Sequence, residues 1–501
     1  MINRNAMPHL VFLIFALSTA WAYWPSLQHA PKHDQIGYLA EMAQRNGLWD
    51  KTIGAYSWHR DRAFMRGDEL LFRPVFNVFL GIQLVLFGYN YSLWQGMSIV
   101  LHLMVGFFMF RLLSTIQPGM SAAVTAGFFL LMLSNVPMVV WHAINGYMLF
   151  CVFLLESLVW FVRYQRDRRD RMALWISLTL MLMSAFTYDA GVFFIAAAAV
   201  FFLFDEKFKP AWLLFLAAAG CYFAGSMADF LYRHLHIQTE TGKVLGGSFS
   251  VQTILNAGTA LKWFFCTGIF LHARDIVSIE RVVVTPLTLD FMWPFKEFSL
   301  HMFRGITLIC VSAGVMFLSV RAVTRSTRQV LVLLVLMLVS FMFFISVGRL
   351  NTRGILTGLL FNSYYTYIFW VLVLPAVYAG VGFEALATRS DGKMIRGVAY
   401  FLLLIFILFN GVSVYNVNTM IAQVDRNRRS FLDTAETFVQ AHRLESGFTF
   451  YASSSCPGNY PGKWLHKAGD PLWRRYTFSE ILYPQYYSRV HPEYIISCGD
   501  H

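Results

Sequence analysis

The chain of 501 residues is 57% hydrophobic and 17% aromatic, only 14% of its residues are charged, and its mean hydropathy is +0.52. A soluble protein of this size needs more polar surface, so the composition excludes that class and predicts a protein that crosses a membrane several times. The formal net charge of +12 lies largely in the expected loops. Orientation rules and phosphate-bearing lipids account for it better than nucleic acid does.

Apolar runs long enough to cross a bilayer recur along the chain. The first follows Arg4 and lacks a small-residue cleavage site, which predicts a retained span and not a removed signal peptide. Two further stretches, Val75 to Leu86 and Val251 to Leu271, are ambiguous. The predicted spans centre near residues 8–25, 92–113, 119–136, 146–162, 172–188, 190–204, 211–231, 303–322, 329–347, 365–386 and 397–416.

Arginine and lysine cluster in the loops at residues 163–171, 321–328 and 389–396. The positive-inside rule predicts all three to be cytoplasmic, and they are if the N-terminus is cytoplasmic and only the runs above are spans. We therefore expect both ambiguous stretches to be interfacial or re-entrant helices on the outer face. Positive charges at residues 426–429 then lie outside and argue against this topology.

The predicted fold is an all-α polytopic membrane protein with about 11 transmembrane helices. Residues 1–416 form the expected transmembrane domain, with long outer-face loops at 26–91 and 232–302 that carry interfacial helices. Residues 417–501 form a periplasmic tail or small domain. Cys151 and Cys221 fall in apolar runs and are expected to be buried. Cys456 and Cys498 in the tail are a candidate disulfide, but no spacing rule fixes the pairing.

The loop from Lys32 to Pro74 carries the densest polar sequence near the N-terminus. Asp34 lies just beyond the first predicted span, where its pKa can be tuned and where it can accept a proton from a hydroxyl. The alternative is a solvated loop aspartate. The ionisable groups Arg60, Glu69 and Arg73 in the same loop favour a site, and we predict Asp34 as a catalytic carboxylate.

The second candidate is Tyr188-Asp189-Ala190-Gly191, where two predicted spans meet with almost no loop between them. An ionisable group at membrane depth is a functional candidate by default, and Asp189 would lie on the same face as Asp34. The alternative is a turn aspartate in a tight helical hairpin.

A third group is Arg349 and Arg353, followed by the aromatic pair Tyr364 and Tyr365. Arginines at a bilayer surface can grip a phosphate through paired hydrogen bonds. Anchoring to lipid headgroups is an equally good interpretation.

A polar stripe formed by Gln95, Ser98 and His102 follows helical spacing. Interhelical hydrogen bonding is the better interpretation of such a stripe. His142, in a short predicted outer loop, is a weaker candidate to line a site on the outer face together with Asp34 and Asp189. The sequence contains no phosphate-binding loop, dinucleotide motif, paired-cysteine zinc pattern or His-Glu-x-x-His. No cofactor is therefore expected, and a divalent metal is not indicated.

This arrangement resembles the membrane-embedded GT-C glycosyltransferases, and Phe72-Arg73-Pro74 through Leu101-His102 looks like the arginine-proline block of their protein O-mannosyltransferase-like members. Those members usually carry a histidine where Gln95 stands, and often two adjacent acidic residues in the first loop. Here only Asp34 is acidic, between His33 and Gln35, which argues against a metal shared by paired carboxylates. Asp189 matches an acidic residue found in the third outer loop of some members.

The resemblance implies displacement at the anomeric carbon of a sugar with a polyprenyl phosphate as leaving group. Asp34 would take the acceptor proton, Asp189 would be a second catalytic residue, and Arg349 or Arg353 would stabilise the phosphate. Secondary donor-binding candidates are Arg60, Arg73 and Glu69. Candidates that line the site are His33, His102, His142 and Tyr188.

The sequence thus predicts a glycosyltransferase of the bacterial inner membrane with its active site on the periplasmic face. Its partners would be a polyprenyl-phosphate-linked sugar, the bilayer, and a glycan, lipid or protein acceptor such as a pilin. Two alternatives remain open: a polymerase or ligase of lipid-linked glycans, and a transporter or flippase of a lipid-linked sugar.

Overall fold

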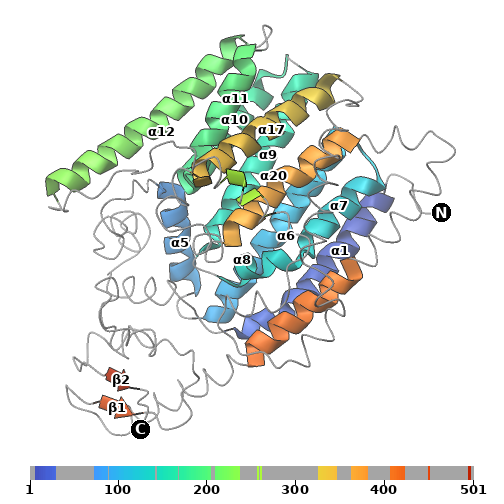
Figure 1. The fold of residues 1–501 in the computed structure, drawn as a ribbon, viewed down its shortest axis with the longest axis vertical. Coiled ribbons are helices and arrows are strands. Elements are labelled where there is room, and N and C mark those ends of the chain that lie inside the picture. The colour runs from blue at the N-terminus through green and yellow to red at the C-terminus, as the bar shows by residue number, and fades with distance from the viewer. Residues whose placement is uncertain are drawn as a thin grey trace.

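The computed structural model describes residues 6–29, 73–87, 90–141, 144–167, 169–204, 209–236, 257–258, 260–261, 264, 325–346, 363–381, 407–423, 449–451 and 495–497. Figure 1 shows that helices make up nearly all of this part of the chain. The helices are α1 (Met7–Tyr23), η1 (Trp24–Gln28), α5 (Pro74–Phe87), α6 (Tyr91–Ile116), α7 (Met120–Leu130), η2 (Leu133–Asn135), α8 (Val136–Val140), α9 (Gly146–Arg166), α10 (Arg171–Thr187), α11 (Ala190–Phe204), α12 (Lys209–His236), α17 (Arg325–Ile345) and α20 (Ser363–Val381). Residues 407–423 form a further helix.

Within the described residues, four helices are long and apolar enough to cross a membrane, or five if one bent pair counts as a single span. The four are Met7–Gln28, Tyr91–Ile116, Gly146–Arg166 and Thr327–Ile345. The chain is therefore a multi-pass membrane protein. The helices α10, α11, α12 and α20 also coincide with predicted spans, but the total of about 11 stays a prediction because other runs lie outside the described residues.

The bent pair differs from the single straight span predicted at residues 119–136. Met120–Leu130 and Leu133–Val140 meet at an angle of 51°. Pro137 lies in the first turn of α8, and proline there begins a helix but cannot continue one. The Asn135 side chain donates to the Phe129 carbonyl oxygen over 2.6 Å, which satisfies one backbone acceptor at the end of α7.

The bundle is organised around α9, which packs along α6 and α10. Figure 1 shows α17 crossing in front of α9 and α10, and α11 packs against both α17 and α12. At the other side, the first and last described helices are joined: Trp21 stacks on Tyr415 at 4.4 Å, and the Asn418 side chain donates to the Ala22 carbonyl oxygen over 3.3 Å. Leu17 of α1 is 62% exposed, which is expected of a side chain that faces lipid.

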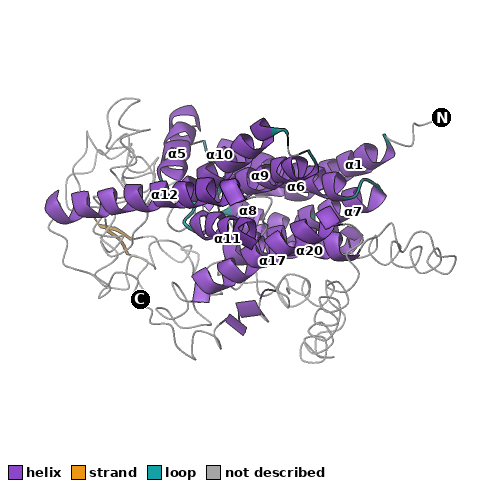
Figure 2. Cartoon of the chain, turned by 90° about the horizontal axis from the view of Figure 1, so that it is seen from above, coloured by secondary structure: helices purple, strands orange, loops and turns teal. Residues whose placement is uncertain are grey.

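The ambiguous stretch Val75 to Leu86 forms α5. At 14 residues this helix is only about 21 Å long, too short to span a bilayer, as an interfacial helix would be. In Figure 2 its axis runs across that of α12, which extends away from the bundle. Little of Val251 to Leu271 is described, but Phe264 is buried and its carbonyl oxygen accepts from the Trp370 side chain of α20 over 3.2 Å.

In the tail, β1 (Thr449–Tyr451) and β2 (Ile495–Ser497) pair in parallel, with Thr449 opposite Ile495. Cys456 and Cys498 lie outside the described residues, and both the disulfide and the division at residue 416 stay predictions. Cys151 is buried as expected, whereas Cys221 is exposed. Cys221 precedes the inward-facing Tyr222 on α12, and neighbouring residues of a helix point in different directions.

Candidate functional site

The candidate site begins at Arg73, the residue before α5. The Asn77 N–H donates to the Arg73 carbonyl oxygen over 3.0 Å, so Arg73 forms the first helical bond of α5. Pro74 follows, and proline is well suited to the first position of a helix because its fixed φ matches and its missing N–H is not needed there. The Arg73 side chain is thereby directed from the start of a short helix into the bundle, where Arg73 is only 7% exposed.

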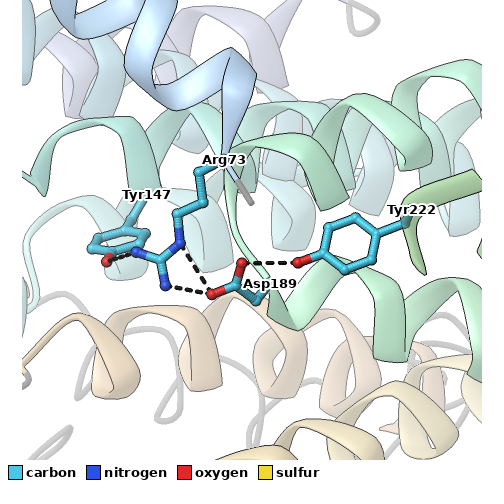
Figure 3. A network of polar contacts seen from close by, with 4 residues as sticks. All are labelled: Arg73, Tyr147, Asp189 and Tyr222. Carbon is cyan, nitrogen blue, oxygen red and sulfur yellow. Dashed lines mark hydrogen bonds and ion pairs between the residues drawn. The ribbon is translucent and has the colours of Figure 1, made fainter. Parts of the chain in front are cut away.

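The partner of Arg73 is Asp189, which lies between α10 and α11. The guanidinium donates from Nε over 3.1 Å and from Nη2 over 2.5 Å, both to Asp189 Oδ2. Figure 3 shows the two side chains approaching from different elements, with Tyr147 on one side and Tyr222 on the other. This ion pair joins residues separated by 116 positions in the chain and ties α5 to the α10–α11 connection.

Asp189 owes its position to a tight connection. Tyr188 is the C-cap residue directly after α10, α11 begins at Ala190, and the Val192 N–H donates to the Asp189 carbonyl oxygen over 3.2 Å. A Cβ on Gly191 would lie 2.5 Å from Ala185 Cα, so glycine is what allows α11 to fold back this closely on α10. Asp189 therefore lies at the N-terminus of α11, where the helix dipole favours a negative charge.

Three tyrosines surround the pair. The Tyr222 hydroxyl of α12 donates to Asp189 Oδ1 over 2.9 Å, and Arg73 Nη1 donates to the Tyr147 hydroxyl of α9 over 2.8 Å. The Arg73 guanidinium carbon lies 4.9 Å from the centre of the Tyr188 ring and 5.6 Å from that of Tyr147. Aromatic faces attract a cation, so the rings replace part of the water that the guanidinium has lost.

The site keeps Arg73 ionised. Burial alone would lower the pKa of the Arg73 guanidinium, but the adjacent Asp189 carboxylate outweighs this effect and holds the pKa well above its usual range. Both carboxylate oxygens of Asp189 accept hydrogen bonds. A guanidinium has five N–H donors, and three of those on Arg73 are used by described residues. The other two N–H groups of Arg73 have no partner among the described residues.

The structure brings together three of the residues predicted from the sequence: Arg73, Asp189 and Tyr188. His102 lies elsewhere, hydrogen-bonded to the Tyr367 hydroxyl over 2.8 Å and to the Leu130 carbonyl oxygen over 2.9 Å. The other predicted site residues lie outside the described residues, and their convergence on Asp189 stays a prediction. These are His33, Asp34, Arg60, Glu69, His142, Arg349 and Arg353.

Gln95 and His102 of the stripe on α6 make bonds between helices, as expected of a structural stripe, whereas Ser98 Oγ has no partner among the described residues. The Gln95 amide donates to Ser26 Oγ over 2.8 Å and to the Val139 carbonyl oxygen over 3.2 Å. Together with the bonds of His102, these contacts hold α6 against η1, α8 and α20.

The sequence interpretation did not single out Tyr147 and Tyr222. Tyr222 follows the run Ala217-Ala218-Ala219-Gly220-Cys221, and small residues on one helix allow a neighbour to approach closely. A single tyrosine next to such a run of small residues could have been predicted to face a neighbouring helix. Tyr147 had only its position after Asn145-Gly146. No group of three or more His, Cys, Asp or Glu residues in the described part of the chain could hold a metal ion.

No protein-family model matches the sequence, and no curated protein matches it. Among solved structures, the chain is similar to the oligosaccharyltransferase of Archaeoglobus fulgidus in its apo form, with 14% identity, a TM-score of 0.42, and coverage of 84% of this chain and 56% of the other. It is also similar to AglB of the same organism in complex with an inhibitory peptide and a dolichol-phosphate, with 10% identity, a TM-score of 0.45, and coverage of 98% and 64%.

The chain thus spans less than two thirds of the length of these archaeal proteins. Its structural similarity to an oligosaccharyltransferase is distant.

Proposed function

We propose that this protein is a membrane glycosyltransferase that moves a sugar from a polyprenyl-phosphate donor to an acceptor, and that Arg73 binds the donor phosphate. The observation that carries the proposal is a buried, charged guanidinium with two N–H groups that have no partner among the described residues. Such a group is suited to phosphate oxygens, which accept paired, charge-assisted hydrogen bonds. The arginine-proline block described above supports the same class.

In the proposed reaction, the bond between the anomeric carbon and the phosphate oxygen breaks as the acceptor hydroxyl attacks. Negative charge then grows on the departing polyprenyl phosphate, and a fixed cation stabilises it without having to reorganise. Asp189 acts here as a positioning residue: both of its oxygens are engaged, one by Arg73 and one by Tyr222.

The remaining roles also belong to the proposal. Asp34 takes the proton of the acceptor hydroxyl, and Arg349 or Arg353 adds to the stabilisation of the phosphate. We propose that the site faces the periplasm of a bacterial inner membrane, with the N-terminus in the cytoplasm and residues 417–501 outside. The acceptor is a glycan, a lipid or a protein.

The test is turnover by the purified protein. Wild type, Arg73→Lys, Asp34→Asn and Arg163→Lys are each incubated with polyprenyl-phosphate-linked hexoses and a membrane extract as acceptor source, and released polyprenyl phosphate is measured. Arg73→Lys keeps the positive charge but loses the planar guanidinium, which can donate two parallel hydrogen bonds. We therefore expect kcat to fall about 100-fold. Arg163 is exposed and its variant serves as the control. Undiminished turnover by Arg73→Lys would overturn the role of Arg73, and full turnover by Asp34→Asn would overturn that of Asp34.

The bent pair Met120–Leu130 and Leu133–Val140 favours a second candidate, a transporter or flippase of a lipid-linked sugar, because broken helices are common at transporter binding sites. This candidate predicts movement without cleavage. If vesicles containing the wild type translocate a fluorescent polyprenyl-phosphate sugar and release no polyprenyl phosphate with any acceptor, the transferase proposal fails in favour of transport.

A further inference from the structure

Asn77, a polar side chain on α5 four residues after Arg73, is buried. Asn77 is 1% exposed, and neither its Nδ2 nor its Oδ1 has a hydrogen-bond partner within the described part of the chain. A buried amide without partners is costly, because it has lost its hydrogen bonds to water and gained none in return. Native proteins rarely keep such a group without a reason, and a ligand that binds there is one reason.

Asn77 lies on the Arg73 side of α5. Its N–H donates to the Arg73 carbonyl oxygen, and residues four apart lie on the same face of a helix with Cβ atoms about 5–6 Å apart. Among the described residues, two N–H groups of Arg73 and both polar groups of the Asn77 amide have no partner. The unsatisfied hydrogen-bonding capacity of α5 is thus concentrated in its first turn.

A second buried amide on α5 provides the contrast. Gln83 is also 1% exposed, but it exchanges two hydrogen bonds with Asn145 at the start of α9, over 3.1 Å and 2.7 Å. A buried amide on α5 can therefore find hydrogen-bond partners in the neighbouring helices. Gln83 fixes the far end of α5, whereas Asn77 is not needed to fix the near end, because the Arg73 ion pair does so.

We propose that Asn77 binds a hydroxyl of the donor sugar, next to the phosphate that Arg73 holds. A sugar hydroxyl both donates and accepts, and the amide offers C=O and NH2 to match it. The inference rests on the proposed function, and it adds a determinant of donor recognition that is independent of the lipid. The phosphate is recognised by charge, and the sugar is recognised by an amide one helical turn away.

The test compares Asn77→Leu with Gln83→Leu, using thermal unfolding and kinetics. Without ligand, Asn77→Leu should unfold at or above the wild-type temperature, because it removes an unpaired buried amide, while Gln83→Leu should unfold at a lower temperature. Bare polyprenyl phosphate should stabilise both variants as it does the wild type. The extra stabilisation from a polyprenyl-phosphate-linked hexose should be lost only in Asn77→Leu, with KM for that donor raised about tenfold.

Donors that lack single hydroxyls sharpen the result. For one deoxy-sugar donor the wild type should show the same raised KM, and Asn77→Leu should show no further increase. If wild type turns over the donors and Asn77→Leu keeps the wild-type KM and stabilisation, Asn77 has only a structural role and the inference is wrong. If wild type neither binds nor cleaves any of these donors, the proposed function itself is wrong and the role of Asn77 falls with it.

Discussion

Two arginine–carboxylate pairs in this protein have the same chemistry and different surroundings. Arg73 and Asp189 approach to 2.5 Å, and Arg111 of α6 and Glu156 of α9 approach to 2.7 Å. The Arg73 side chain is 9% exposed and that of Arg111 is 40% exposed. The first pair joins α5 to the α10–α11 connection, and the second links two helices that already pack together. Burial, and not the ion pair itself, makes the first pair a candidate site.

The two carboxylates are equally exposed, at 13% each, but they differ in how their oxygens are hydrogen-bonded. Each accepts from an aromatic donor as well: Tyr222 donates to Asp189 over 2.9 Å, and Trp160 donates to Glu156 over 2.7 Å. Asp189 accepts from Arg73 through Oδ2 and from Tyr222 through Oδ1. Glu156 accepts from both Arg111 and Trp160 through Oε1, and its Oε2 has no partner among the described residues. Asp189 is held from two sides and fixes the direction of Arg73, whereas Glu156 is held from one.

The largest effect should come from Asp189→Asn, which removes the charge and keeps the shape. The buried Arg73 guanidinium loses its counter-charge, and we expect the free energy of unfolding to fall by about 3–5 kcal/mol. Thermal unfolding in detergent measures this, and KM for a polyprenyl-phosphate donor should rise in any folded fraction. A loss of stability no larger than that of Glu156→Gln would contradict the difference between the two pairs.

Gly191→Ala should have the next largest effect. The added Cβ would meet the backbone at Ala185, which cannot move aside as a flexible side chain would, so we expect a loss of up to about 3 kcal/mol and displacement of Asp189. The control is Gly220→Ala on α12, where nothing lies within 4 Å of an added Cβ and stability should stay the same or rise. Equal stability of the two variants would show that the tight connection does not hold the site.

Tyr222→Phe tests the second side of Asp189. The change removes a hydrogen bond to a carboxylate and should lower the free energy of unfolding by about 1.5 kcal/mol, without losing the ion pair. Trp160→Phe is the counterpart at the Arg111–Glu156 pair, where it removes the hydrogen bond from Trp160 to Glu156. For each pair, thermal unfolding is measured for the aromatic variant, for the charge-neutral variant of its carboxylate (Asp189→Asn or Glu156→Gln), and for the double variant that combines them. Additive effects in the Tyr222 and Asp189 double variant would argue against one coupled network.

The sequence predicts the helices of this protein well because a bilayer demands long apolar runs, and α6, α9 and α10 begin and end close to the predicted residues. The bend after α7 was missed because hydropathy does not register the effect of Pro137. Asp189 could be found because it is a charge in an apolar context. Its pairing with Arg73 could not, because contacts between residues 116 positions apart depend on how helices pack, which no local pattern encodes.

The smallest effect should come from Glu156→Gln. Glutamine keeps an oxygen that accepts from Trp160 and Arg111, so only the charge is lost, and the 40% exposed Arg111 side chain can turn to solvent or to lipid phosphates. Exposed ion pairs contribute about 1 kcal/mol or less, so the unfolding temperature should change little and donor turnover not at all. A destabilisation as large as that of Asp189→Asn would mean that Arg111 is confined despite its exposure. Carboxylate charge would then matter equally in both pairs, and burial would no longer single out Arg73 as the site.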